Sequence, residues 1–214
     1  MIAEIKIENH GYLQNQTWKP HNGLNIINGR NGSGKTFLVK ELAKQQGKIK
    51  YLPYAVQSFA QYSNIDAFAV PQKKPQSTFN EEYKVIEMLA ENIPLIQECN
   101  SFLRQFNCTE LFESAVESGW LFFRNEKCTG RRAVTLETIT DGEKTLFILW
   151  LILQNIKNYD VLILDEFDAY LSENNCVELY KILDNLANSG LQIFIATHRK
   201  IGNWKIVDGM LLTA

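Results

Sequence analysis

The run GRNGSGKT at residues 29–36 matches the template G-x-x-x-x-G-K-S/T at every fixed position, and this match constrains the chain more than any other feature. Glycines in such a loop let backbone N–H groups turn inward, where they bind the phosphates of a nucleotide. The Lys35 ammonium is expected to reach the β- and γ-phosphates, and the Thr36 hydroxyl to ligate Mg²⁺. The predicted nucleotide-binding residues are Asn31, Gly32, Ser33, Gly34, Lys35, Thr36 and Phe37.

The segments that flank this loop are those expected of a phosphate-binding loop, a strand before it and a helix after it. Residues 23–28 (GLNIIN) indicate a short buried strand, and residues 36–45 (TFLVKELAKQ) place apolar side chains at a helical spacing. Gly47 follows as a residue that ends the helix. The N-terminus of that helix adds a partial positive charge to the same anion site. A strand, a loop and a helix in this order disfavour the alternative, a glycine-rich turn without a ligand.

Two carboxylates, Asp165 and Glu166, directly follow the apolar run VLIL at residues 161–164. Such a run is typical of a strand buried in a parallel sheet, and ligands of open α/β sheets bind at the carboxyl ends of the strands. Asp165 is therefore predicted to support the Mg²⁺ shell opposite Thr36, and Glu166 to orient and polarise the attacking water. The alternative is that both residues merely cap a strand end at the surface.

The wider pattern predicts an α/β fold, with a mostly parallel sheet and flanking helices, because apolar runs alternate with helical periods around the loop. The predicted strands span residues 2–8, 23–28, 48–54, 161–164 and 192–197, with a closing pair near 204–207 and 210–212, and the predicted helices span residues 36–45, 143–157 and 173–187. Residues 9–22 are predicted to be rich in loops.

One domain of 214 residues is expected. Residues 1–61 and 136–214 would form its nucleotide-binding core, and residues 62–135 a small helical lobe with a hairpin. Within the lobe, residues 71–80 indicate a surface linker, residues 81–106 have helical periodicity broken near Pro94, and residues 120–124 and 133–137 indicate the two strands of the hairpin.

Composition narrows the class of protein. The net charge of −2 gives no global attraction to nucleic acid, so DNA binding would need a local patch. Four scattered cysteines without paired spacing are typical of reduced thiols in a cytoplasmic protein. The longest apolar run, residues 146–153, is too short to span a bilayer, and no signal peptide is expected, since residues 1–7 alternate like a strand.

The order of four motifs (GRNGSGKT, ITDGEKT, VLILDE and IATH) resembles the ATP-binding-cassette (ABC) class of P-loop ATPases. The resemblance covers roughly residues 1–60 and 135–214, and residues 23–27 and 142–146 (GEKTL) are more similar to the SMC and RecF branch than to transporters. It implies a P-loop NTPase fold of ABC ATPase type, with an N-terminal antiparallel β portion. It also implies Mg²⁺-dependent hydrolysis of ATP.

The resemblance also implies roles for single residues. Thr140 and Gly142 stand at the signature motif, which caps the γ-phosphate of ATP bound to a second subunit, so an ATP-sandwiched homodimer is implied. From the residues alone, Thr140 and Glu143 fit a capping box equally well. His198 stands at the switch histidine, which contacts the γ-phosphate and the attacking water, although a satisfied core histidine is the alternative. The catalytic residues are thus expected to be Lys35, Glu166 and His198.

The resemblance further implies a glutamine that reaches the metal. Gln57 is assigned as this glutamine, with Gln61 as the alternative. The predicted metal ligands are therefore Thr36, Gln57 and Asp165. Tyr12 and Trp18 are both candidates for stacking on adenine, and either could instead belong to the core.

Three departures from the family pattern bear on turnover and dimer communication. Asp141 replaces the first signature glycine, Phe167 stands where transporters commonly have proline, and residues 168–172 lack the aspartate expected at the end of the loop after Glu166.

Two cellular roles follow as hypotheses. The first is an ATPase that drives or gates an effector protein in DNA metabolism, repair or defence; the alternative is the nucleotide-binding subunit of a membrane transporter. About a hundred residues separate Thr36 from Thr140, which leaves no room for a long coiled coil. Basic residues on the predicted hairpin could bind DNA or an acidic partner, or could simply be solvated: Arg124, Lys127, Arg131 and Arg132.

Overall fold

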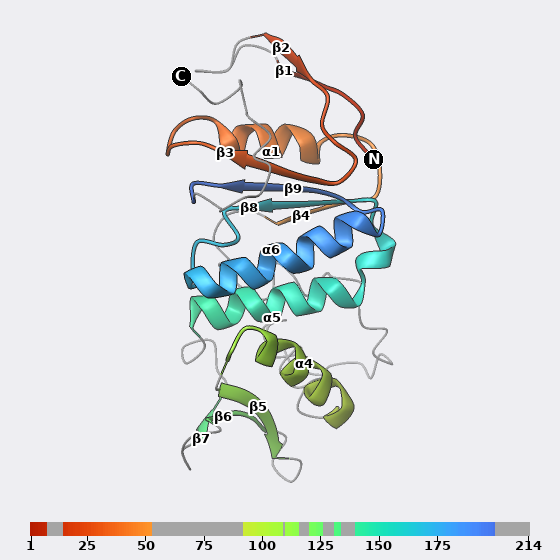
Figure 1. The fold of residues 1–214 in the computed structure, drawn as a ribbon. Helices are drawn as coiled ribbons and strands as arrows, with labels where there is room; N and C mark the ends of the chain where they lie inside the picture. Colours follow the sequence, from red (N-terminus) through yellow and green to blue (C-terminus); the bar gives the residue numbers. More distant parts are fainter. Residues whose placement is uncertain are drawn as a thin grey trace, which may run out of the picture. The chain divides into compact units, whose positions relative to one another are not determined.

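The computed structural model describes residues 1–7, 15–52, 92–108, 110–115, 120–125, 131–133 and 140–199 (Figure 1). Two compact units are present, the first formed within residues 1–55 and 157–214, and the second within residues 56–156. The predicted division into core and lobe at residues 61 and 135 stays a prediction. The expected linker at 71–80 and the closing pair at 204–212 lie outside the described residues.

The first unit is built on a parallel sheet of four strands in the order β3-β9-β8-β4. The strands are β3 (Leu24–Asn28), β9 (Gln192–Thr197), β8 (Val161–Asp165) and β4 (Ile49–Leu52). Every residue of β8 and β9 is buried, as expected for central strands covered on both faces. The predicted α/β class with a mostly parallel sheet is confirmed, and the four strands were all expected from sequence.

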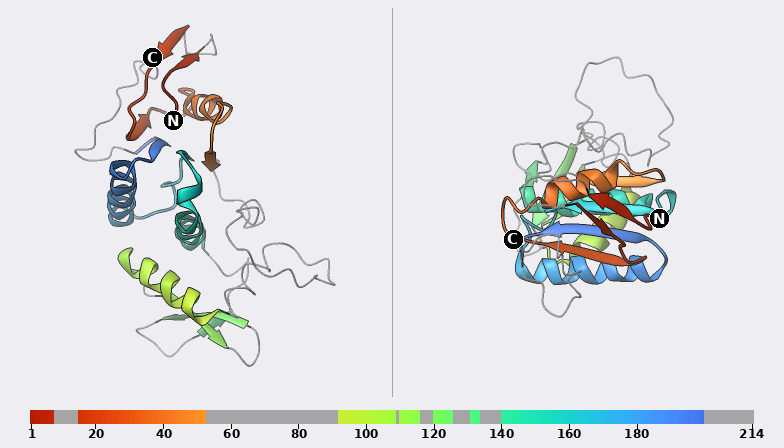
Figure 2. Two further views of the ribbon diagram at one scale, coloured as in Figure 1. Left: turned by 90° about the vertical axis from the view of Figure 1, so that its right-hand side faces the viewer. Right: turned by 90° about the horizontal axis from the view of Figure 1, so that it is seen from above.

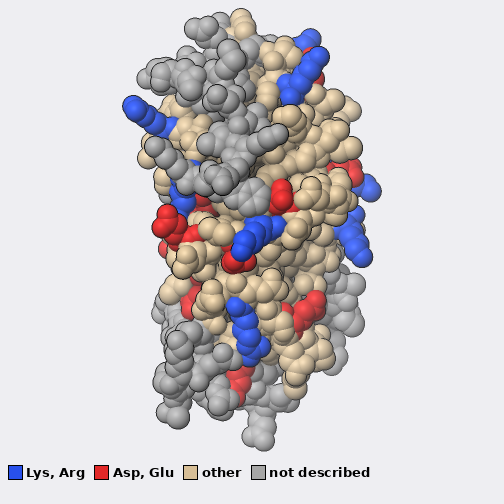
Figure 3. Space-filling model, viewed as in Figure 1, with Lys and Arg blue, Asp and Glu red and all other residues tan. Residues whose placement is uncertain are grey.

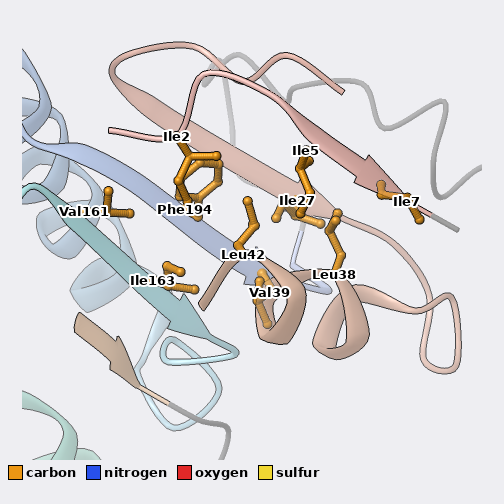
Figure 4. Close-up of a cluster of buried hydrophobic side chains, with 11 residues drawn as sticks. Ile2, Ile5, Ile7, Ile27, Leu38, Val39, Leu42, Val161, Ile163 and Phe194 are labelled. Atoms are coloured by element: carbon orange, nitrogen blue, oxygen red, sulfur yellow. The ribbon is translucent and has the colours of Figure 1, made fainter. Parts of the chain in front are cut away.

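Helices cover the two faces of this sheet: α1 (Lys35–Ala43) lies on one side and α6 (Glu173–Asn188) on the other (Figures 1 and 2). Between α1 and the sheet lies a core of buried aliphatic and aromatic side chains, most of which Figure 4 labels. The sheet contributes Ile27, Val161, Ile163, Phe194 and Ala196, the helix contributes Leu38, Val39 and Leu42, and the N-terminal segment contributes Ile2, Ile5 and Ile7.

The N-terminal segment forms a separate antiparallel pair of β1 (Ile5–Ile7) and β2 (Gln16–Trp18). This pair confirms the predicted antiparallel portion, but β2 lies within the stretch predicted to be rich in loops, because three residues are too few to carry an alternating pattern. The Trp18 ring meets the Phe194 ring edge-on, with the centroids 5.7 Å apart. Of the two places predicted for Trp18, the structure therefore supports packing in the core.

Two buried amides fasten the first unit at the amino ends of its strands. Gln192, the first residue of β9, accepts a bond from the backbone N–H of Ile2 (2.6 Å) and donates to the carbonyls of Ile2 and His21 (2.9 Å each). Asn25 on β3 donates to His21, Gly23 and Ile193 carbonyls. Both side chains are fully buried, and the oxygen and nitrogen of each amide make hydrogen bonds, so they hold the N-terminal segment against the sheet.

The second unit combines two helices with a three-stranded antiparallel sheet, in the order β5-β6-β7. Helix α4 (Ile93–Gln105) lies beside β5 (Figures 1 and 2). The remaining elements are β5 (Glu110–Ala115), β6 (Trp120–Asn125), β7 (Arg131–Ala133) and α5 (Asp141–Gln154). A short 3-10 turn, η1 (Ile156–Asn158), contains the boundary between the two units in the chain.

The predicted break of helical periodicity near Pro94 agrees with the start of α4, where Pro94 occupies the first turn behind an Asn92 cap and its missing N–H costs nothing. Two other local predictions in the second unit need correction. The hairpin pairs Phe122 with Ala133, and its second strand begins at Arg131, two residues earlier than predicted. Strand β5 was not predicted, because ELFESA at residues 110–115 alternates only weakly.

The core of the second unit lies around α5, whose residues from Thr145 to Ile152 are all buried. The Asn100 side chain on α4 bonds both backbone groups of Phe112, donating at 2.7 Å and accepting at 2.8 Å. The Phe112 ring in turn packs against that of Phe147. Helix α4, strand β5 and helix α5 are thereby held together by one buried amide and a pair of rings.

On the face shown in Figure 3, basic and acidic side chains of the described residues are interspersed, in keeping with the net charge of −2. Among the described residues, none of the helices has the length and apolar character needed to cross a membrane. The three described cysteines, Cys99, Cys108 and Cys176, are free thiols, as predicted, and Cys128 lies outside the described residues.

Replacing Gln192 with Leu is expected to lower the free energy of unfolding by about 2–4 kcal/mol, because both backbone groups of Ile2 would lose their buried partner. Chemical denaturation measures this change. Lys181→Ala, at an exposed position of α6, is the matched control and should stay within about 0.5 kcal/mol of the wild type. A Leu variant as stable as the control would contradict the clamping role.

Candidate nucleotide-binding site

The phosphate loop (residues 29–36) connects β3 to α1 at the carboxyl end of the parallel sheet. Gly32 and Gly34 both have left-handed backbone angles, with φ of 81° and 96°. Nothing lies within 4 Å of a Cβ built on Gly32, so its glycine is required by backbone conformation and not by space. Gly34 is the N-cap of α1, which begins at Lys35, one residue earlier than predicted.

A pocket of about 410 Å³ lies over this loop, within the size range of ligand sites. It is lined by Asn31, Gly32, Gly34, Lys35, Thr36, Phe37 and Glu166. Six of the seven residues in and beside the loop that are predicted to bind nucleotide therefore line one pocket. The seventh, Ser33, has a buried hydroxyl that makes no hydrogen bond to a described residue.

Lys35 brings a positive charge to the base of this pocket, and its side chain is only 4% exposed. The ammonium donates to the carbonyls of Gly29 (2.9 Å) and Arg30 (3.2 Å), and lies 3.4 Å from Glu166 Oε1. A buried charge needs such compensation, since desolvation otherwise costs several kcal/mol. A ligand phosphate would compete with these oxygens for the same ammonium.

Asp165 lies at the end of β8 with both carboxylate oxygens engaged. Oδ1 accepts from the Thr36 hydroxyl at 3.3 Å and Oδ2 from the Tyr51 hydroxyl at 3.4 Å. Burial raises the pKa of Asp165 above its ordinary value, with the Thr36 hydrogen bond as the leading opposing effect. The structure thus brings together the two predicted metal ligands, Thr36 and Asp165.

This pair fits Mg²⁺, which prefers oxygen ligands and commonly takes only one or two from the protein beside water and phosphate. A bound cation would also stabilise the charged form of Asp165, and so oppose the rise in its pKa that burial causes. Among the residues that the structure describes, no group of three or more His, Cys, Asp or Glu residues could hold a metal by itself.

Glu166 and His198 face each other beside Lys35. Glu166 has a left-handed φ of 49°, unusual for a residue with a side chain, and its N–H donates to the Ala196 carbonyl at 2.8 Å. This kink ends β8 and leaves the side chain lining the pocket. Glu166 Oε2 is 3.8 Å from His198 Nδ1, and the His198 side chain is 47% exposed. The alternative of a core histidine is therefore wrong.

Thr140 and Gly142 belong to the second unit, at the start of α5. Thr140 Oγ1 accepts from the Glu143 N–H at 3.3 Å, and Glu143 Oε2 accepts from the Thr140 N–H at 2.7 Å. The capping box is therefore present, and the signature role stays a prediction. Gln57, Gln61 and Tyr12 lie outside the described residues.

Sequence reasoning did not identify Tyr51 as a residue of the site. Its ring does pack against the core, yet its hydroxyl also bonds Asp165. No local signal could have found this contact, because it depends on β4 and β8 being neighbours in the sheet.

The family described as "AAA domain, putative AbiEii toxin, Type IV TA system" matches residues 48–199, more than half of the chain. The chain belongs to this family. Among solved structures, it is similar to a protein from Pyrococcus furiosus described as "Putative ABC transporter (ATP-binding protein)", with a TM-score of 0.52 and 15% identity over 94% of this chain and 91% of that one. Together with the pocket, these findings confirm the fold of an ABC-type P-loop ATPase.

Other solved structures are more distant. A "putative metal-chelate type ABC transporter" has a TM-score of 0.48 and 15% identity, over 87% of this chain and 67% of that one. The Smc head domain from Pyrococcus yayanosii has a TM-score of 0.37 and 16% identity, over 49% of this chain and 22% of that one. Neither supports a structural argument. No curated protein matches this member of the AAA family.

Replacing Asp165 with Asn is expected to stabilise the nucleotide-free protein at about pH 7.5, since burial penalises the charged carboxyl. The folded state holds the Asp165 proton more tightly than the unfolded state. The penalty is thus present above the folded-state pKa and is lost as the pH falls through it, so the gain in Tm should shrink towards about pH 4.

Thermal unfolding of both proteins across this pH range tests the prediction. The control is Asp160→Asn, at an exposed position before β8, which should leave the Tm unchanged. A lower Tm for Asp165→Asn at neutral pH would show that the desolvation account is wrong.

Proposed function

We propose that this chain is a Mg²⁺-dependent ATPase that converts ATP and water to ADP and phosphate. The observation that carries the proposal is that Lys35, Thr36 and Glu166 line one pocket, while Asp165 lies 3.3 Å from Thr36 and His198 lies 3.8 Å from Glu166. The chain thus offers a cation for phosphate, oxygen ligands for a metal, and a carboxylate beside an imidazole. Hydrolysis of a phosphoanhydride needs this combination.

In this proposal, the phosphate loop binds the triphosphate through its backbone N–H groups and the N-terminus of α1. Lys35 then exchanges its contacts with Gly29, Arg30 and Glu166 for phosphate oxygens. The exchange keeps the buried ammonium compensated, and it frees Glu166 from its ion pair. Binding of the nucleotide would therefore prepare the carboxylate for its next role.

Thr36 and Asp165 would hold the metal ion, with Gln57 as a further ligand proposed from sequence alone. When bound, Mg²⁺ neutralises negative charge on the phosphate oxygens. Tyr51 keeps Asp165 in place from the side of β4.

Glu166 acts in the proposal as the acceptor of a proton from the attacking water. The water oxygen forms a bond to the γ-phosphorus while the bond from that phosphorus to the bridging oxygen breaks. ADP leaves with the electron pair, and the water proton passes to Glu166. His198, half exposed at 3.8 Å from Glu166, orients the water and the γ-phosphate.

We further propose that two chains sandwich two ATP molecules, with Thr140 and Gly142 of each chain capping the γ-phosphate bound by the other. The support is the N-terminus of α5, where the positive end of the helix dipole attracts anions. Asp141 and Glu143 in the first turn oppose this attraction, so the cap would be weaker than in a signature with two glycines.

For the cellular role, we propose a cytoplasmic ATPase of the SMC and RecF-like branch that drives or gates an effector protein in DNA metabolism, repair or defence. The family description, which names a toxin of a type IV system, supports a role in defence. The GEKTL run after Asp141 supports the same branch. The alternative, a transporter subunit, rests on a structural neighbour that is 15% identical, which supports the fold alone.

Glu166→Gln is expected to retain ATP binding and to lower turnover by about 10²–10⁴-fold, because the amide keeps the size of the side chain but cannot accept the proton. ATP affinity should rise, since Lys35 loses a competing carboxylate. Phosphate release and a binding titration measure the two effects, and light scattering after size exclusion with ATP and Mg²⁺ detects the trapped dimer.

Glu178→Gln, on an exposed part of α6, serves as the control and should behave like the wild type. Wild-type turnover in Glu166→Gln would remove Glu166 from the mechanism. A variant that binds ATP without turnover and stays monomeric at saturating ATP would contradict the sandwich dimer.

A further inference from the structure

A buried polar cluster joins the segment after Glu166 to the strand end before His198. It consists of Asp168, Tyr180, Thr197 and Arg199, and is called the Asp168 cluster below. Thr197 Oγ1 donates to Asp168 Oδ2 at 2.7 Å, and the Tyr180 hydroxyl donates to the same oxygen at 3.4 Å. The first three side chains are fully buried.

Arg199 binds the same segment from the other side of His198. Its guanidinium donates to the carbonyls of Ala169 (3.0 Å) and Leu171 (2.8 Å). Its backbone N–H donates to Thr197 Oγ1 at 3.0 Å. The Thr197 hydroxyl is therefore a donor to Asp168 and an acceptor from Arg199 at once, so it fixes the backbone on both sides of His198.

The phosphate loop is tied to this arrangement as well. Asn28, the last residue of β3 and the neighbour of Gly29, donates from its side chain to the Arg199 carbonyl at 2.6 Å. The backbone that carries His198 is thus bound to the strand that enters the phosphate loop and to the segment that follows Glu166. One set of hydrogen bonds therefore joins the end of β3, the segment after Glu166 and the backbone on either side of His198.

His198 depends on these neighbours for its position. Its side chain is 47% exposed, and its Nδ1 lies 3.8 Å from Glu166 Oε2. A half-exposed imidazole gains little from packing, so its place is set by the backbone on either side. Burial of Asp168 is costly, as its raised pKa indicates, and the Thr197 hydrogen bond is the leading compensation. Two apolar side chains in place of Asp168 and Thr197 would avoid the cost of burying a carboxylate, but they could not accept the hydrogen bond from the Arg199 N–H.

We propose that Asp168, Thr197 and Arg199 are positioning residues that hold His198 against Glu166 for hydrolysis. They do not line the pocket, and they act through the backbone of residues 197–199. The inference rests on the proposed ATPase function. It predicts that losing the Thr197 hydroxyl impairs turnover and spares nucleotide binding, because the phosphate loop and Lys35 keep their contacts.

Three variants test the proposal. Thr197→Val keeps the shape of the side chain and removes the hydroxyl, whereas Thr197→Ser keeps the hydroxyl and removes a methyl group. Arg199→Lys keeps the charge and loses the two-carbonyl contact, at a half-buried site. Lys181→Ala, exposed on α6, is the control.

For Thr197→Val and Arg199→Lys, kcat is expected to fall by about 10- to 100-fold, with the Kd for ATP and Mg²⁺ within about twofold of the wild type. Thr197→Ser should keep kcat within about threefold. A purely structural role predicts instead that any loss of kcat accompanies a loss of thermal stability and of ATP affinity, since Thr197→Val leaves the buried Asp168 carboxylate without its hydrogen bond. Nitrogen NMR signals of the His198 ring, assigned with His198→Gln, should shift in Thr197→Val and stay unchanged in Thr197→Ser and Lys181→Ala.

Wild-type kcat and unshifted His198 signals in Thr197→Val would overturn the proposal. It would also be overturned if Val and Ser lost nucleotide affinity together with thermal stability, since that result marks a structural role. Absence of ATP turnover in the wild type would instead refute the proposed function. The His198 signals of the nucleotide-free protein would then still decide whether the Asp168 cluster positions the ring.

Discussion

The buried ammonium of Lys35 is the interaction on which the arrangement of the site depends. A charge that is 4% exposed must be compensated, and here two loop carbonyls and Glu166 compensate it. The loop must therefore curl around the lysine, which requires left-handed backbone at Gly32 and Gly34. The partner carboxylate must come from another strand, and the kink at Glu166 supplies it. Since phosphate oxygens can replace all three contacts, the arrangement that stabilises the nucleotide-free protein is also the one that would bind triphosphate.

The parallel sheet makes this meeting possible. Strands β8 and β9 are buried along their whole length, and their ionisable side chains lie at or just after the carboxyl ends, at Asp165, Glu166 and His198. Because these strands are neighbours and parallel, the three side chains gather at one edge, beside the loop that follows β3. The Asp168 cluster then determines how closely Glu166 and His198 approach. In this account the sheet brings the three side chains together, and the buried hydrogen bonds of the Asp168 cluster set the distance between Glu166 and His198.

Local patterns were enough to predict much of this site. The loop template, the apolar run before Asp165 and the strand before His198 each carry their signal in consecutive residues, so the fold class and the lining of the pocket followed from sequence. Features that depend on which strands are neighbours could not be predicted from such local patterns. For example, Tyr51 bonds Asp165 only because β4 lies next to β8. Asp168 carried no signal at all, since its partners Thr197 and Tyr180 are distant in the chain.

The central claim is that Lys35 exchanges its carbonyl and carboxylate contacts for nucleotide phosphates. Calorimetric titration of the wild type and of Lys35→Met with ATP and Mg²⁺ tests it most directly. The account predicts one nucleotide bound per chain by the wild type, and an affinity at least about tenfold weaker in the variant, since a charge-assisted contact is lost. No binding by the wild type at high ligand excess, or equal affinity of the two proteins, would contradict it.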